Sequence, residues 1–329
     1  MRLGSRRWPA LLALLLVGTA EAETPPIAKP GIPALQRPAD KLHPAFVRKL
    51  GRNADWVQIT ARGAWVAATG PDAVDHVDAR TGRIDRRIPL PGEACAGLAL
   101  GFGSLWVPLC GGAPRTARID LASGKIAAIL PFGPPEEGGI AASRDSIWLA
   151  TDSLGSLARI NPRTNSIRQT IKLASGSTNP VVDGNALWIT SVDHDQVTKI
   201  DVRTGRVLAT AHTGPSPRFL TVGAGSVWTL NQGDGTVTRI SADGRRVQAT
   251  VKLGIPGHGG DIHFGGGRVW ATSIGMPLTV IDPRHNQVVA QWVGKGGDSL
   301  GFGHRSIWLT DYRAGLLARL PVSGLGLPR

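Results

Sequence analysis

Aromatic residues other than tryptophan are scarce in this chain, which holds one Tyr and six Phe against ten Trp in 329 residues. Long apolar runs are also missing beyond the N-terminus, where no segment approaches the roughly 18 residues that a membrane-spanning helix needs. A helical composition is disfavoured as well, because 43 Gly and 24 Pro are typical of a turn-rich β protein. Apolar residues make up 42% of the chain, which is enough for a packed core. We therefore expect a globular β protein without a transmembrane segment in its mature form.

The first 22 residues have the organisation of a secretory signal peptide. Basic residues precede a short apolar run over residues 11–18, and Ala20-Glu21-Ala22 offers an A-x-A cleavage site. The apolar run is too short to span a bilayer stably, and a retained membrane anchor is the alternative. The sequence therefore predicts a periplasmic or secreted protein whose mature chain begins near residue 23.

Acidic side chains are in the minority, with 24 Asp and Glu against 37 Lys and Arg and a formal charge of +13. Loss of three Arg and one Glu with residues 1–22 leaves about +11 (13 − 3 + 1). Such a balance attracts polyanions. Outside the cytoplasm we exclude nucleic acid, which leaves lipid headgroups, acidic polysaccharide or cell-wall polymer. The alternative is that the charge belongs to the fold, because basic residues return at one repeat position: Arg118, Arg159, Lys199, Arg239 and Arg319.

Seven of the tryptophans recur at intervals of 38 to 42 residues: Trp65, Trp106, Trp148, Trp188, Trp228, Trp270 and Trp308. Each follows a turn, a small or polar residue and an aliphatic residue, as in Gly103-Ser104-Leu105-Trp106. A period near forty suits a unit of four short strands. We predict an all-β fold, a seven-bladed β-propeller of four-stranded blades over residues 45–323, with these tryptophans packed between blades. Trp56 and Trp292 fall outside the pattern and are either packing or surface residues.

An Asp-initiated turn returns in four repeats, as in residues 78–82 and 201–205, with an Asn-initiated one at 161–165, and each ends on Gly or Asn. An aspartate that hydrogen-bonds its own turn, followed by a residue that tolerates a left-handed backbone, is what a tight hairpin with a bulge requires. Turn capping therefore explains these carboxylates better than catalysis does.

The chain ends predict how the ring closes. The last unit has its third strand at residues 316–320 but no outermost strand, whereas residues 46–51 resemble the outermost strand at 247–254. We expect the N-terminal strand to complete the last blade and to leave no long free edge. The six prolines of residues 23–44 predict an extended linker, and residues 324–329 form a C-terminal tail. Deletion of residues 45–51 should destabilise the ring, and deletion of 23–42 should not.

Cys95 and Cys110 are the two cysteines of the chain, and they flank the Gly101-Phe102-Gly103 turn symmetrically. In a two-residue antiparallel hairpin they would face each other directly. Because an exported compartment permits oxidation, we expect a structural disulfide. A nucleophilic cysteine is the alternative.

Functional residues are expected at one mouth of the central channel, where loops enter each first strand and leave each second strand. His258 would suit a general base, while Asp261, Glu137 and Asp298 would offer oxygen ligands to Mg²⁺ or Ca²⁺. The residues that would suit an anionic or peptidic ligand are Arg218, Asn179, Tyr312 and Arg313. Exposed loops are ordinarily polar, so plain solvent exposure is the alternative for every one of them.

The segment Asn179-Pro180-Val181-Val182-Asp183-Gly184-Asn185-Ala186-Leu187-Trp188-Ile189-Thr190 resembles the repeat of streptogramin B (virginiamycin B) lyases and related YVTN-type seven-bladed propellers. The resemblance covers nearly all of residues 45–323 and implies a propeller fold. In the lyases a His base, an acidic residue and Mg²⁺ at the channel mouth open a cyclic depsipeptide by elimination. Their blades typically continue Leu-Trp-Phe-Thr-Glu, whereas no blade of this chain has Glu at the third position after Trp.

Two functions follow from these observations. The first is an exported binding or scaffolding module, a monomer that holds a small ligand, an anionic envelope polymer or a protein and needs no cofactor. The second is a metal-assisted lyase of a cyclic, ester-containing small molecule. In it His258 would be the base, Asp261 or Glu137 a ligand of Mg²⁺ or Ca²⁺, and Arg218 the anion stabiliser.

Overall fold

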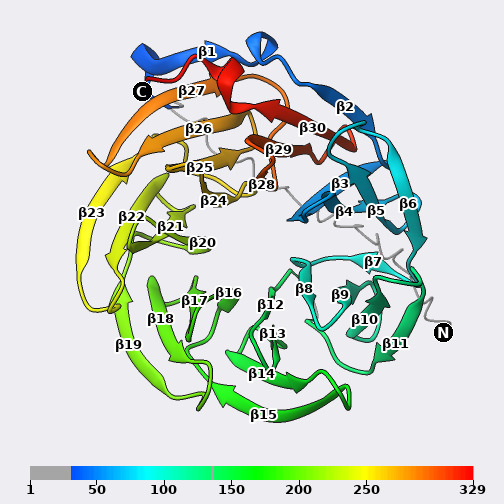
Figure 1. Ribbon diagram of the computed structural model, residues 1–329. Coiled ribbons are helices and arrows are strands. Elements are labelled where there is room, and N and C mark those ends of the chain that lie inside the picture. Colours follow the sequence, from blue (N-terminus) through cyan, green and yellow to red (C-terminus); the bar gives the residue numbers. More distant parts are fainter. Residues whose placement is uncertain (1–30, 135–136, 329) are drawn as a thin grey trace, which may run out of the picture.

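Seven β-sheets stand around a central axis and form a closed ring (Figure 1). The computed structural model describes residues 31–134 and 137–328, so the predicted signal peptide lies outside the described residues. Apart from strands, the described residues form three short 3-10 helices: η1 (Pro33–Leu35), η2 (Ala39–Lys41) and η3 (Val322–Leu325). The predicted all-β, seven-bladed propeller is confirmed.

Each blade is built on an antiparallel sheet, and the strands of blades one to five follow one another outwards from the channel in chain order. Blade one contains β3 (Asn53–Ile59), β4 (Gly63–Thr69), β5 (Ala73–Asp78) and β6 (Ile84–Pro89). Blade two contains β7 (Glu93–Ala94), β8 (Ala99–Gly101), β9 (Ser104–Cys110), β10 (Arg115–Asp120) and β11 (Ile126–Leu130). Blade three contains β12 (Ile140–Ala142), β13 (Ile147–Ala150), β14 (Ser156–Asn161) and β15 (Ser166–Lys172). Blade four contains β16 (Ser177–Asp183), β17 (Ala186–Ser191), β18 (Gln196–Asp201) and β19 (Val207–His212). Blade five contains β20 (Pro217–Gly223), β21 (Ser226–Asn231), β22 (Thr236–Ser241) and β23 (Val247–Lys252).

The last two blades take up strands from the N-terminal segment. Blade six contains β24 (Ile262–Gly265), β25 (Arg268–Ser273), β26 (Met276–Asp282) and β27 (Gln287–Val293), with β1 (Gln36–Pro38) added beyond β27. Blade seven contains β28 (Leu300–Gly303), β29 (Ser306–Asp311), β30 (Leu316–Pro321) and, outermost, β2 (Phe46–Lys49). β2 lies antiparallel to β30, with Phe46 opposite Arg319. The predicted closure by the N-terminal strand is confirmed.

The repeated tryptophans are buried in the second strand of each blade, with at most 4% of the side chain exposed. In five blades a basic residue of the third strand covers the indole, at 4.8 Å from the ring centroid for Arg239 over Trp228. The Arg239 guanidinium then donates to Pro283 O and Asn286 Oδ1 in the turn of the next blade, both at 2.8 Å. We call this arrangement of tryptophan, cation and neighbouring turn the latch. The latches place these repeated basic residues between blades.

The Asp-initiated turns have the predicted chemistry. Asp78 Oδ1 accepts the backbone N–H and the hydroxyl of Thr81, both at 2.8 Å, and these hydrogen bonds lower the pKa of the Asp78 carboxyl. The turn ends on Gly82 at a φ of 64°, a left-handed value that glycine adopts without strain.

Residues 31–44 differ from the extended linker that their proline content predicts. Ile32 N–H donates to Gln291 Oε1 at 2.6 Å, and β1 pairs in parallel with β27. Arg37 lies 5.2 Å from the centroid of the Trp292 ring and donates to Leu325 O at 2.7 Å. Proline sets a local extended conformation but does not prevent docking on a sheet edge. This stretch is therefore part of the ring, and Trp292 is a buried packing residue.

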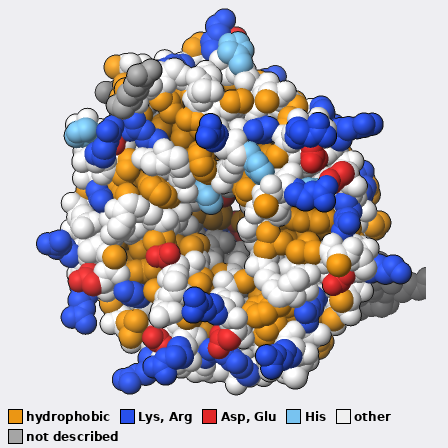
Figure 2. Space-filling model, viewed as in Figure 1, with side chains coloured by type: hydrophobic (Ala, Val, Ile, Leu, Met, Phe, Trp, Pro, Cys, Tyr) orange, Lys and Arg blue, Asp and Glu red, His pale blue; other side chains and the backbone are white. Residues whose placement is uncertain are grey.

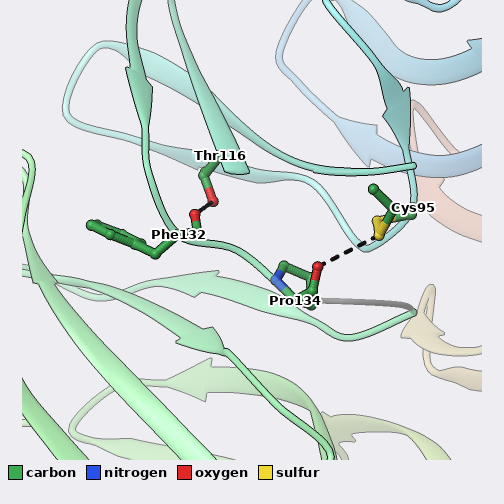
Figure 3. The surroundings of a disulfide bond; sticks show 5 residues. Cys95, Thr116, Phe132 and Pro134 are labelled. Carbon is green, nitrogen blue, oxygen red and sulfur yellow. Dashed lines mark hydrogen bonds between the residues drawn. A yellow bond between two sulfur atoms is a disulfide. The ribbon is translucent and has the colours of Figure 1, made fainter. Parts of the chain in front are cut away.

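Cys95 and Cys110 form the expected disulfide, with Cα atoms 5.6 Å apart. They are not directly opposite, because the innermost strand of blade two is interrupted between β7 and β8. Pairing follows the predicted hairpin at Gly101–Ser104 but shifts to Glu93–Cys110 in β7. The Sγ atom of Cys110 lies 3.6 Å from the Pro134 carbonyl oxygen, so the bridge borders the loop into blade three (Figure 3).

Candidate binding site at the channel mouth

Six of the seven blades line a cavity of about 300 Å³ at one end of the channel. Its lining residues lie at the ends of first and second strands and in the loops next to them. On the face of the ring that Figure 2 shows, a hollow lies at the centre and Lys and Arg side chains are spread over the surrounding surface. The lining residues with polar or large side chains are Asn53, Asp55, Trp56, Thr69, Glu93, Cys95, Glu137, Phe219, Ile274, Asp298, Ser299 and Tyr312.

Two carboxylates lie in the wall of this cavity beside blades one and seven. Asp55 Oδ1 accepts the Trp56 N–H at 2.7 Å and the hydroxyl of Ser299. Burial and the neighbouring Asp298 charge raise the pKa of Asp55 well above its usual range. Asp298 accepts the Gly260 N–H at 2.9 Å, and burial together with the Glu137 charge raises its pKa to about 6. The mouth therefore carries acidic groups in a protein whose net charge is strongly positive.

Asp261 lies below the mouth, in the wall of the channel. Its carboxylate accepts the backbone N–H of Ile262 at 2.7 Å and that of Leu300 at 3.2 Å. Burial raises its pKa to about 7 despite these hydrogen bonds. Two residues further along, in β24, burial lowers the pKa of His263 to about 4, which keeps the imidazole neutral at physiological pH.

The ligand-binding residues expected from sequence divide into two groups. Tyr312 lines the cavity, and burial raises the pKa of its hydroxyl. Arg313, the next residue, is exposed and is not among the lining residues. Arg218 pairs with Glu137 at 2.7 Å, and its backbone carbonyl accepts the buried amide of Asn179 at 3.0 Å. Asn179 therefore supports the irregular start of β20 that carries Arg218.

The residues expected to hold a metal are not gathered around one point. Asp261 uses both oxygens on backbone N–H groups, Asp298 accepts the Gly260 N–H, and Glu137 pairs with Arg218. Over residues 31–134 and 137–328, no three His, Cys, Asp or Glu side chains are grouped as ligands of one ion. His258 is exposed on its loop and does not line the mouth cavity. As arranged, Asp261, Glu137 and Asp298 do not form one ligand set, and metal binding and the catalytic role of His258 stay predictions.

Sequence reasoning missed Asp55, Phe219 and Ser299, and it left Trp56 undecided. A signal for most of them is present in the repeat. The residues nine positions before the repeated tryptophans are Trp56, Gly97, Gly139, Asn179, Phe219, Asp261 and Ser299. Because equivalent residues of a propeller lie at one depth, these seven form one layer across the channel, which we call the channel layer.

The ring is similar to a solved structure, that of BamB from Moraxella catarrhalis. The TM-score is 0.62, and the match covers 84% of this chain and 97% of that one at 14% sequence identity. A likeness at this identity shows the fold alone. No family model matches the sequence, and no curated protein matches it. The resemblance to streptogramin B lyases stays a prediction beyond the shared propeller fold.

Within the described part of the chain, no helix has the length and apolar character to cross a membrane. The assignment of the protein to the periplasm or the exterior stays a prediction.

The raised pKa of Asp298 predicts a pH-dependent stability. Its folded-state pKa of about 6 exceeds the unfolded value of 3.8, so the native protein binds more protons between about pH 4 and 6. Stability from this group is present at low pH and is lost as pH rises through that range. Asp298→Asn should therefore be more stable than wild type at pH 7, by about 1–2 kcal/mol, and equal to it near pH 4.

Urea unfolding of both proteins at pH 4, 5, 6 and 7 measures this difference. The stability contribution of His263 changes with pH in the opposite direction, but it is the same in both proteins and cancels in the difference between them. A stability difference that does not change with pH would contradict the assignment.

Proposed function

We propose that this protein is an exported binding module whose ligand site is the channel mouth. The observation that carries the proposal is the cavity of about 300 Å³ lined by residues of six blades. Such a volume is at the lower end of the range typical of ligand pockets. The polar residues that line it differ from blade to blade, so the blade repeat does not require them.

The lining favours a neutral or cationic ligand over an anionic one. Asp55 and Asp298 lie in the cavity wall, while the nearby guanidinium of Arg218 is already paired with Glu137. Aromatic and aliphatic surface is contributed by Trp56, Phe219 and Ile274. A small molecule, or a side chain that protrudes from a protein partner, would find both apolar contact and complementary charge there.

Tyr312→Ala tests the proposal, with Arg313→Ala as a matched control from the same loop. Ligand-observed NMR with a set of soluble amines, sugars and carboxylates would identify fragments that bind wild type. We expect amines or neutral fragments to bind, Tyr312→Ala to weaken them by roughly tenfold, and Arg313→Ala to leave them unchanged. Fragments that bind all three proteins equally, or none that binds wild type, would contradict a mouth site.

The metal-assisted lyase is the second proposal that the sequence resemblance leaves. It predicts a thermal shift with Mg²⁺ or Ca²⁺ that a chelator reverses, and loss of substrate turnover in His258→Ala. Absence of both responses would end it without affecting the binding proposal.

A further inference from the structure

Trp56 has a backbone conformation that large side chains rarely adopt. Its φ is 51°, in the left-handed region, and it is the unpaired residue of a bulge between Asp55 and Val57 in β3. Asn179 occupies the same repeat position in blade four, also at a φ of 51°. Asparagine tolerates this region, whereas tryptophan is unfavourable there. Bulges of this kind redirect a side chain, and here the bulge directs an indole into the channel.

The surroundings fix the indole in that place. The backbone N–H of Trp56 donates to Asp55 Oδ1 at 2.7 Å and to Ser299 Oγ at 3.0 Å, which ties the bulge to blade seven. The Phe219 ring lies 6.3 Å away between centroids. Gly97, in the adjacent blade, lies beside the ring, since a Cβ atom there would stand at an ordinary contact distance of 3.9 Å from Trp56 Cε3. The channel layer thus combines two large aromatic residues with small ones.

Trp56 separates two cavities. The mouth cavity of about 300 Å³ lies on one side, and a second cavity of about 200 Å³ lies deeper, bounded by the first strands of the blades and containing His263 in its wall. Trp56 and Phe219 are the two residues that line both. Both side chains are buried, with 9% and 6% exposed. Trp56 and Phe219 therefore lie at the boundary between the two cavities.

We infer that Trp56 is the floor of the mouth site and sets the maximum length of ligand that the site accepts. The site takes a compact molecule or the end of a side chain, and a polymer cannot pass through the ring. This inference rests on the proposed function, since it concerns the ligand of the same cavity. Trp56 is a specificity-determining residue in this account, and the bulge exists to present it.

Trp56→Gly tests the inference, because glycine accepts the left-handed backbone and removes the floor. The probes are n-alkylammonium ions from ethyl to octyl, which match the acidic, partly apolar mouth. In wild type we expect affinity to rise about fourfold for each added methylene and then stop rising once the cavity is filled. In Trp56→Gly the rise should continue to longer chains. Trp56→Phe, which retains an aromatic floor, should keep a limit close to that of wild type.

The outcomes separate the two proposals. If the probes bind wild type but the length limit is unchanged in Trp56→Gly, the role of Trp56 as the floor is wrong and the mouth site stands. If no probe binds wild type more tightly than Tyr312→Ala, the mouth site is wrong, and so is the role of Trp56. A crystal structure of Trp56→Gly gives an independent check. A continuous passage between the cavities supports the inference, whereas collapse of Phe219 into the space overturns it.

Discussion

Deletion of residues 45–51 is expected to abolish cooperative folding of the ring. These residues contain β2, which supplies the outermost strand of blade seven and pairs with β30 over four residues. Without β2 the edge of β30 is unpaired, and the side chain of Phe46 no longer packs edge-on against Trp308 at 5.6 Å between centroids. Exposed β edges promote association between chains. Size-exclusion chromatography and thermal unfolding should show an aggregating protein with a broad transition or none.

A circular permutant provides the matched control. A chain that begins at residue 52 and carries residues 31–51 after residue 328, joined by a flexible linker, retains every residue of the described N-terminal segment. It should restore a monomer with a single sharp transition. If the deletion unfolds as cooperatively as wild type, β2 does not close the ring. Deletion of residues 31–44 alone should have an intermediate effect, because it removes β1 and the contact of Ile32 with Gln291.

The second large effect is expected from Trp148→Ala in the latch of blade three. The indole is fully buried, and its Nε1–H donates to Ser143 Oγ at 3.0 Å. Arg159, itself 5% exposed, lies 5.0 Å from the ring centroid. Removal of the indole leaves a cavity between two blades and should lower the free energy of unfolding by about 3–5 kcal/mol. Urea denaturation monitored by circular dichroism measures the change.

A double-mutant cycle isolates the contact between indole and guanidinium. Trp148→Ala and Arg159→Ala, singly and together, should show a coupling energy of about 1–2 kcal/mol. Leu208→Ala, at an outer-strand position with 48% exposure, is the control and should change stability by less than about 0.5 kcal/mol. A coupling energy near zero would mean that the tryptophan and the arginine stabilise the ring independently.

The blade architecture could be predicted because it is periodic. The tryptophans at a spacing near forty mark the second strands, and Asp78 and its equivalents mark the turns between third and outermost strands. The relation between residues 46–51 and 247–254 revealed the closure, since a missing strand at one end matched a surplus strand at the other. Such features repeat, so a single chain carries several independent copies of the same information.

The candidate site could be predicted only in outline, because it consists of departures from the repeat. The mouth loops were identified, but Tyr312 and Arg313 are adjacent, and only the three-dimensional path of the loop separates the lining residue from the exposed one. Trp56 reaches the channel through a bulge, which shifts the alternation of β3 by one residue and defeats an argument from periodicity. The docking of residues 31–44 depends on Gln291, which is far away in sequence. The proline content of the segment gives no information about this contact.

Ring closure also bears on the order of events during folding. Phe46 pairs with Arg319, which lies 273 positions further along the chain (319 − 46). β2, which emerges early in synthesis, must therefore wait for β30, the last strand, and the fold has a high proportion of non-local contacts. Such topologies fold slowly. Until residue 319 is available, a nascent chain can form individual blades but not the ring, so the unfinished protein exposes strand edges. This long-lived open form is the state that chaperones would encounter.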